Sequence, residues 1–131
     1  MVPEENAWTD AQCLTSLDGV TFAKSASSFT PVTLVNGWTG YGGTASPAAR
    51  NISGIVHLEG ATLTSGTNPL AFTLPAGDRP AHDIFVKVDL CHADNGQLSI
   101  APSGSVTVQA EGGNWANAQC FTSLDGASFA R

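Results

Sequence analysis

The segment Asp83 to Cys91, with the sequence DIFVKVDLC, alternates strictly between apolar residues and a mixed set. A period of two residues is typical of a β-strand with one buried face, because successive side chains point to opposite faces of a sheet. The apolar face predicted for this strand consists of Ile84, Val86, Val88 and Leu90. The opposite face carries a mixture that can meet another subunit and consists of Phe85, Lys87, Asp89 and Cys91.

Similar short runs lie on both sides of this strand, separated by segments rich in Gly, Pro, Asn and Asp. The further predicted strands are 31–38, 55–63, 70–74, 97–101 and 105–110. The sequence lacks a sustained apolar period of 3.6 residues, so almost no helix is expected. Strands at this spacing predict an all-β fold, an antiparallel β-sandwich of the jelly-roll kind. The glycine-rich residues 39–51 show no period and are expected to form a long ordered loop.

A second feature of the sequence is a duplicated segment. Residues 8–24, WTDAQCLTSLDGVTFAK, and residues 115–131, WANAQCFTSLDGASFAR, are identical at 11 of 17 positions. We therefore divide the chain into an N-terminal segment with its linker, residues 1–28, and a β-sandwich domain, residues 29–131. In the first copy we expect a strand over residues 11–17, followed by an Asp18-Gly19 turn of the kind that joins the strands of a hairpin.

The duplication also suggests a mode of assembly. If the C-terminal copy completes a sheet of the domain, the N-terminal copy can occupy the equivalent groove of a neighbouring subunit or pack beside its twin. An unchanged oligomer mass and melting temperature after deletion of residues 1–24 would contradict this hypothesis.

Composition narrows the classes of partner. Charged residues make up only 12% of the chain, and 5 basic against 11 acidic residues give a net charge of −6. A negative chain with few cations repels phosphates, so nucleic acid is not an expected partner. No apolar run approaches the roughly 18 residues of a membrane span, and the first residues, MVPEENAW, lack the apolar core of a signal peptide. A surface of neutral polar residues is typical of extracellular or virion-borne β proteins.

The sequence contains three cysteines, Cys13, Cys91 and Cys120. Because the number is odd, at least one is free or pairs between chains. The simplest interpretation is that all three are small buried apolar side chains. A bridge between Cys13 and Cys120 is an alternative if the two copies lie side by side. Neither of these has a CxxC neighbour or a His at ligand spacing, so no metal site and no cofactor are expected.

Several short strings in the domain follow one another in a characteristic order. They are NGW at 36–38 with YGG at 41–43, GIVHLEG at 54–60, FTLPAGDRPA at 72–81 and SLDGASF at 123–129. In combination they resemble the C-terminal tip domain of minor tail proteins and tail fibres from phages of actinobacteria, over residues 34–131. Similar trimeric jelly rolls also occur as free bacterial lectins. The resemblance implies a trimeric β-sandwich head that binds a cell-surface receptor, usually a glycan.

Recognition of a sugar requires an aromatic face for the C–H side of a pyranose ring and planar polar groups for its hydroxyls. Such groups occur together in the loop that follows residue 38. They occur again around Trp115, which also has Asn114 as a polar neighbour in the sequence. Residues 94–95 form a polar turn. For each Trp, the alternative is an anchor in the core or in a subunit interface. The predicted ligand-binding residues are Trp38, Tyr41, Arg50, Asp94, Asn95, Trp115, Asn117 and Gln119.

We expect no enzymatic activity, because the three histidines, His57, His82 and His92, are scattered and neither G-x-S-x-G nor H-E-x-x-H is present. The expected function is binding of cell-surface glycans by a homotrimer, either as a tail-type receptor-binding tip or as a free lectin. The alternative is a structural trimerisation or repeat module that has no ligand of its own.

Overall fold

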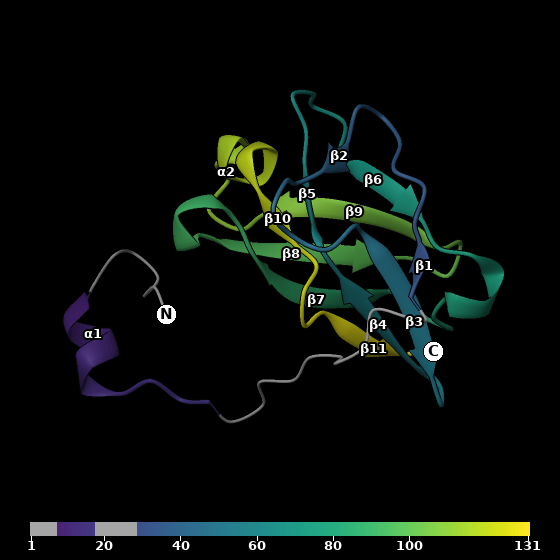
Figure 1. Cartoon of the computed structure of the whole chain (residues 1–131), viewed down its shortest axis with the longest axis horizontal. Helices are drawn as coiled ribbons and strands as arrows, with labels where there is room; N and C mark the ends of the chain where they lie inside the picture. Colours follow the sequence, from purple (N-terminus) through teal and green to yellow (C-terminus); the bar gives the residue numbers. More distant parts are fainter. Residues whose placement is uncertain (1–7, 18–28) are drawn as a thin grey trace.

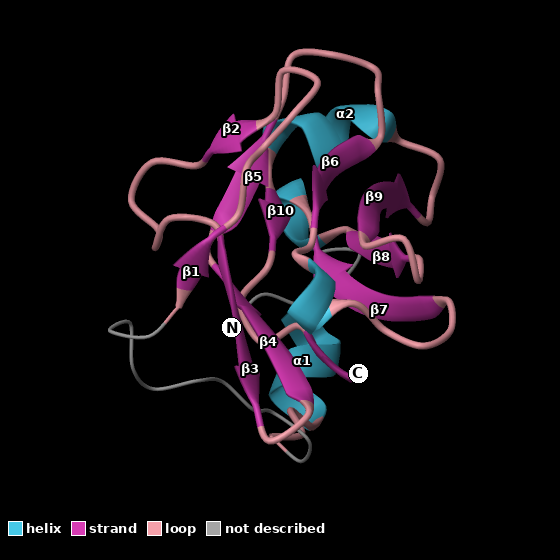
Figure 2. Cartoon of the chain, turned by 90° about the vertical axis from the view of Figure 1, so that its right-hand side faces the viewer, coloured by secondary structure: helices cyan, strands magenta, loops and turns pink. Residues whose placement is uncertain are grey.

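The computed structural model describes residues 8–17 and 29–131, and the latter form two facing layers of antiparallel strands (Figure 1). The first layer contains, in order across the sheet, β1 (Thr30–Pro31), β3 (Ala48–Ile52), β4 (Ile55–Glu59) and β11 (Ser128–Ala130). The second layer contains β6 (Leu70–Thr73), β9 (Ser105–Ala110), β8 (Asn95–Ile100) and β7 (Ile84–Asp89). Figure 2 shows β3 and β4 on one side of the domain and β7, β8 and β9 on the other.

A third, three-stranded sheet continues the first layer across a corner. Its strands, in order, are β10 (Thr122–Ser123), β5 (Ala61–Leu63) and β2 (Thr39–Gly40). Strand β4 passes into β5 through Gly60, and β10 passes into β11 through a turn at Asp125. The carboxylate of Asp125 accepts a hydrogen bond of 2.7 Å from the backbone N–H of Gly60. This bond ties together the two strands that change sheet at the corner.

The Asp-Gly turn of the duplicated segment therefore does not join a hairpin in the C-terminal copy. Strand β10 pairs with β5 and β11 pairs with β4, so the two strands do not pair with each other. The buried Leu124, which precedes the turn, donates its backbone N–H to the carbonyl of Gly60. The Asp-Gly dipeptide predicts that the strands on its two sides pair with each other, but each of them pairs with a different strand instead. The equivalent turn, Asp18-Gly19, lies outside the described residues.

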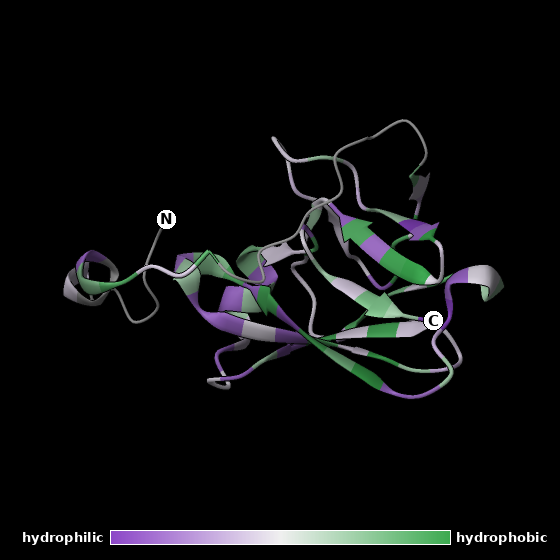
Figure 3. Ribbon diagram, turned by 90° about the horizontal axis from the view of Figure 1, so that it is seen from below, coloured by the Kyte–Doolittle hydropathy of each residue, from purple (hydrophilic) through white to green (hydrophobic). Residues whose placement is uncertain are grey.

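The core lies between the layers and is formed by the inward side chains of alternating strands, whose apolar and polar bands are visible in Figure 3. Two isolated bridges, Leu34 with Phe72 and Leu90 with Thr122, connect the layers at their edges. The largest fully buried apolar side chains are Phe72, Leu74, Leu90, Leu98, Ile100, Leu124, Val56, Val106 and Val108. The prediction of an all-β, antiparallel sandwich is confirmed.

The predicted strands at 55–63, 70–74, 83–91, 97–101 and 105–110 are confirmed, whereas residues 31–38 contain only the short β1 and the bridge at Leu34. The predicted loop at 39–51 is wrong, because it contains β2 and most of β3. Strand β3 pairs with β4 over five residue pairs and buries two consecutive alanines, Ala48 and Ala49. Its sequence, AARNI, therefore shows no alternation, and its strand conformation depends on its partner.

In the described part of the chain, helical structure is limited to α1 (Trp8–Cys13), α2 (Trp115–Cys120) and two 3-10 turns, η3 (Ala76–Asp78) and η4 (Cys91–Ala93). The strand expected over residues 11–17 is wrong, because residues 11–13 belong to α1 and residues 14–17 are not in a strand. Six residues make fewer than two helical turns, too few for a period of 3.6 residues to be visible. Within residues 8–17 and 29–131, no helix has the length and apolar character of a membrane span.

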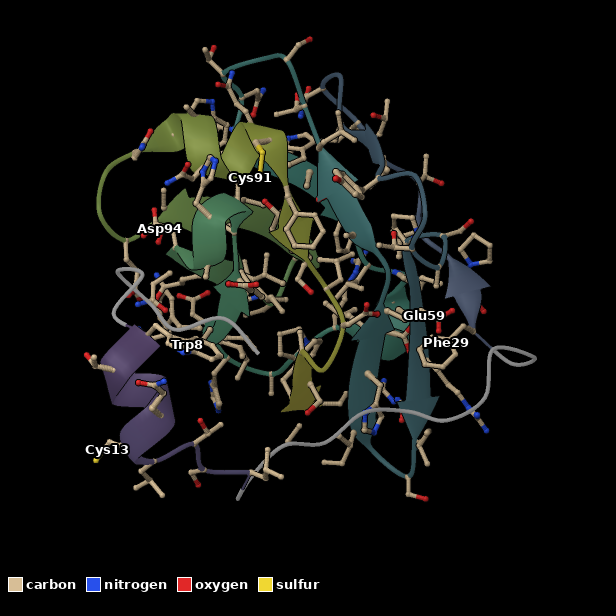
Figure 4. All side chains as sticks on the ribbon, turned by 60° about the vertical axis from the view of Figure 1, so that its left-hand side comes forward. Trp8, Cys13, Phe29, Glu59, Cys91 and Asp94 are labelled. Atoms are coloured by element: carbon tan, nitrogen blue, oxygen red, sulfur yellow. A yellow bond between two sulfur atoms is a disulfide. The ribbon has the colours of Figure 1, made fainter. Side chains whose placement is uncertain are left out.

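The odd number of cysteines correctly predicted an unpaired one, but the expectation of three buried side chains and the alternative Cys13–Cys120 bridge are both wrong. Cys91 forms a disulfide with Cys120 across a Cα–Cα distance of 5.8 Å, and Cys13 is free and exposed. None of the three is fully buried. The turn η4, which begins at Cys91, brings this residue to the last residue of α2. A sequence separation of 29 hides this proximity. Figure 4 shows Cys91 close to α2 and Cys13 on the distant α1.

Two buried threonines on neighbouring strands provide a matched test of buried polar groups. Thr62 and Thr122 face each other on β5 and β10 and are both fully buried. The hydroxyl of Thr122 donates to the carbonyl of Ala118 at 3.0 Å, whereas the hydroxyl of Thr62 has no hydrogen-bond partner among the described residues. A buried hydroxyl without a partner costs about 1–3 kcal/mol.

We therefore expect Thr62→Val to raise the free energy of unfolding by about 1 kcal/mol, because a methyl group replaces an unpaired hydroxyl of the same size. Thr122→Val is expected to lower it by about 1 kcal/mol, because the hydrogen bond to Ala118 is lost. Urea unfolding of the two variants and the parent chain measures both changes. Changes of the same sign in the two variants would contradict this account.

Candidate ligand-binding site

Helix α2 is held on the domain by the side chains of its first and fifth residues. The indole N–H of Trp115 and the amide of Gln119 both donate to the carbonyl of Gly66, at 3.0 and 2.9 Å. Residues four apart lie on the same face of a helix, which explains why one carbonyl receives both bonds. Trp115 also contacts Trp38 edge to face, with ring centroids 6.0 Å apart. These contacts fix the orientation of the Trp115 ring.

The fixed ring of Trp115 lines an open hollow of about 310 Å³ between α2 and strand β9 of the second layer. Its lining combines apolar surface with two polar side chains and consists of Thr67, Pro69, Val108, Gln109, Ala110, Gly113 and Trp115. Gln109 accepts a hydrogen bond from Gln97, which orients its amide group and keeps its nitrogen as a donor. An indole with a hydroxyl and an amide at one surface can contact both the C–H face and the hydroxyls of a sugar.

Sequence reasoning identified Trp115 but missed Thr67 and Gln109. Gln109 occupies an outward position on β9, between the buried Val108 and the half-buried Ala110. Its place in the alternation therefore predicted an exposed side chain, but only the fold brings it to Trp115. Thr67 lies in a turn that is 48 residues from Trp115 in the sequence (115 minus 67), and the sequence carries no signal that joins them.

A second group of predicted residues forms a hydrogen-bonded cluster under the other side of α2. The amide of Asn117 donates to the carboxylate of Asp94 at 2.8 Å, and its oxygen lies 3.1 Å from Nδ1 of His92. The same carboxylate accepts the backbone N–H of Asn95 at 3.0 Å. His92, which was not predicted, and Ala93 adopt left-handed backbone conformations, with φ of 63° and 56°.

This cluster lies beside the disulfide at Cys91, as the positions of Cys91 and Asp94 in Figure 4 show. Its polar atoms are directed at one another, and left-handed residues other than Gly persist only where the surroundings hold them. The arrangement therefore joins η4 to α2 and positions the helix that carries Trp115. Asn117 is separated from the hollow by the helix, because it lies two residues after Trp115.

The third predicted group, after residue 38, is not gathered at one surface. Trp38 is only 3% exposed, and its indole N–H donates to the carbonyl of Asn68, so this residue is an anchor in the core. Tyr41 is 40% exposed and contacts Phe121 edge to face. Arg50 lies on β3 opposite His57. Tyr41 is therefore the residue of this group whose aromatic ring is exposed to solvent.

In residues 8–17 and 29–131, no three His, Cys, Asp or Glu side chains come together as a group that could hold a metal ion. Comparisons with known proteins find no family model, no curated protein and no solved structure that matches the chain. The resemblance to phage tail tips thus stays a prediction that rests on the sequence strings.

Proposed function

We propose that the chain is a non-enzymatic glycan-binding β-sandwich. The observation that supports this proposal is the hollow in which Trp115 lies with Thr67 and Gln109. Its aromatic and aliphatic wall suits the C–H face of a sugar, and its hydroxyl and amide groups suit adjacent sugar hydroxyls. The hollow is open rather than enclosed, which suits the end of a surface glycan better than a small buried metabolite.

The glycan-binding form is proposed to be a homotrimer. Phe85 projects from the outward face of β7 and is 63% exposed. Its neighbour on that face, Lys87, forms an ion pair with Glu111, which lowers the charge of the surface around Phe85. An exposed aromatic ring on a face of low charge suits a subunit contact. Three weak sites displayed together gain avidity on a surface that carries many glycans.

We also propose that the protein works outside the cell or as part of a tail particle. The Cys91–Cys120 disulfide supports this location, because disulfides persist in oxidising environments and are rare in reducing ones.

A glycan array probed with the full chain tests the proposal, followed by titration of the best glycan. Gln109→Ala is expected to weaken binding about tenfold, because one hydrogen bond to the sugar is worth roughly 1.4 kcal/mol. Tyr41→Ala is the matched control, since it removes an exposed ring that lies outside the hollow. Loss of binding in Tyr41→Ala with full binding in Gln109→Ala would move the site to Tyr41. A negative array at high protein concentration would overturn glycan binding.

A structural repeat module is the second candidate function, and one observation favours it. The N-terminal copy begins with the same short helix as the C-terminal copy, yet its Trp8 is 58% exposed. A module of this kind would assemble through its segments and would show no selective binding on the array.

A further inference from the structure

The C-terminal copy occupies a slot in the rest of the domain. Helix α2 is anchored by the bonds of Trp115 and Gln119 to Gly66 and by the disulfide to Cys91, and the strands that follow pair with β5 and β4. The buried residues of this copy are Ala118, Thr122, Leu124, Ala127 and Phe129. The slot thus recognises a defined set of side chains.

The N-terminal copy retains nearly all of this set. The copies differ at six positions (17 minus 11), and in the C-terminal copy five of these six positions are half-buried or exposed. Only one buried position differs, where Val20 corresponds to Ala127. The residues that correspond to the anchors and to the other buried positions are unchanged and are Trp8, Ala11, Gln12, Cys13, Thr15, Leu17 and Phe22. The positions that are identical in the two copies thus include the anchors and all but one of the buried positions.

In the described part of this copy, residues 8–17, the large apolar side chains are exposed. Trp8, Leu14 and Leu17 are 58%, 78% and 69% exposed, and Cys13 is a free thiol. In Figure 1 helix α1 stands away from the sandwich, on a different side from α2. The corresponding residues of the C-terminal copy, Trp115 and Leu124, are half-buried and fully buried. Trp8 and Leu17, which this copy leaves in water, thus correspond to side chains that the slot covers in the other copy.

We propose that residues 8–17 of one chain dock into the terminal-segment slot of a second copy of this chain, in place of its residues 115–124. Trp8 takes the position of Trp115 against Gly66, and Leu17 takes the position of Leu124. The incoming segment carries the same buried residues as the outgoing one, while Asp10 and Leu14 replace Asn117 and Phe121, which contact Asp94 and Tyr41. The exchange thus keeps the buried contacts and joins two chains. Its extent therefore rises with protein concentration, and the chain on its own keeps its C-terminal segment in place. The interaction does not depend on glycan binding.

Docking also places Cys13 beside Cys91, where thiol–disulfide exchange can make the link covalent. The Cys13 thiolate attacks the sulfur of Cys91, a Cys13–Cys91 bond forms, the Cys91–Cys120 bond breaks, and its electron pair leaves with the Cys120 thiolate. One thiol and one disulfide are consumed and one of each is formed. The step requires no oxidant, and it joins two chains.

The test uses the full chain carrying Cys13→Ser and Cys120→Ser, in which Cys91 is the only thiol and the chain's own N-terminal copy cannot form the bond. A synthetic peptide of residues 8–17 is added in excess with oxidised glutathione. We expect a Cys13–Cys91 adduct, detected by mass spectrometry, and at least tenfold less adduct with the matched Leu17→Asp peptide. Equal adduct with the two peptides, or none with either, would overturn the proposal.

If circular dichroism shows that this variant is unfolded, the unmodified chain takes its place, and the expected product is the same adduct with a newly free Cys120 thiol. The identity of the partner is tested with the Cys120→Ser chain, as a mixture of ¹⁵N-labelled and unlabelled molecules at high concentration. We expect Cys13–Cys91 peptide pairs that contain one labelled and one unlabelled member. Pairs of uniform label alone would show that the segment enters its own slot, which would overturn docking between chains.

Discussion

Replacing Gly60 with alanine is expected to lower the free energy of unfolding by about 2–5 kcal/mol, as the sum of backbone strain and overpacking. Gly60 has a φ of +91°, a conformation that L side chains rarely adopt. A Cβ atom at this position would lie 2.5 Å from the carbonyl oxygen of Ala45 and 2.9 Å from the nitrogen of Pro47. Both neighbours are backbone atoms, so relief of the clash requires the chain before β3 to move.

Gly54 provides the matched control. Its φ of +87° is nearly the same, but a Cβ atom there meets nothing within 4 Å. Gly54→Ala therefore carries the backbone strain alone, and we expect a loss of about 1–2 kcal/mol. Urea unfolding of both variants measures the two losses in free energy of unfolding. Their difference is the cost of the clash between the added Cβ atom and the backbone at the corner. Equal losses in the two variants would show that the corner does not require a glycine for space.

The comparison of Gly54 with Gly60 also shows what the sequence can and cannot predict. The two glycines bracket one alternating strand, and the sequence predicts that strand correctly because its apolar residues recur every second position. The sequence does not reveal that the two glycines have different roles. Gly54 lies in the turn between β3 and β4, whereas Gly60 is the point at which the strand leaves one sheet for another. That distinction depends on Ala45 and Pro47, which approach Gly60 only in the folded chain.

A similar limit applies to β3 and to the cysteines. Strand β3 buries Ala48 and Ala49 in succession, so its sequence has no period of two and was predicted as a loop. Cys91 and Cys120 meet because η4 and α2 converge, and no local pattern encodes that meeting. Apolar residues at every second position predicted the strands that are buried on one face. Segments whose conformation depends on contacts with residues far away in the sequence were predicted poorly.

For the candidate site, the sequence predicted the types of residue better than their grouping. Trp115 lies in the hollow as an aromatic wall, but its expected neighbour Asn117 belongs to the cluster on the other side of α2. Almost no helix was expected from the sequence, so the separation of these two residues around the axis of α2 could not be foreseen. Gln109 comes from β9 and reaches the hollow only through packing of the layers.

Removal of the disulfide with Cys91→Ala and Cys120→Ala is expected to lower the free energy of unfolding by about 3–4 kcal/mol. The bond closes a loop with a sequence separation of 29, and a loop of this size gives roughly that value in the chain-entropy estimate. The left-handed backbone at His92 and the hydrogen bond between Asn117 and Asp94 depend on the same attachment of η4 to α2. Loss of the bond should therefore also loosen α2, with a change in the fluorescence of Trp115.

Cys13→Ser is the control for this pair of substitutions, because Cys13 is free and exposed and its replacement leaves the disulfide intact. We expect its unfolding midpoint in guanidinium to equal that of the parent chain. A reducing agent should lower the midpoint of the parent and of Cys13→Ser alike, and should leave the double alanine variant unchanged. If the double variant matched the parent under oxidising conditions, α2 would be held by its noncovalent contacts alone. Trp38, Gly66 and the buried Leu124 would then account for its attachment to the sandwich.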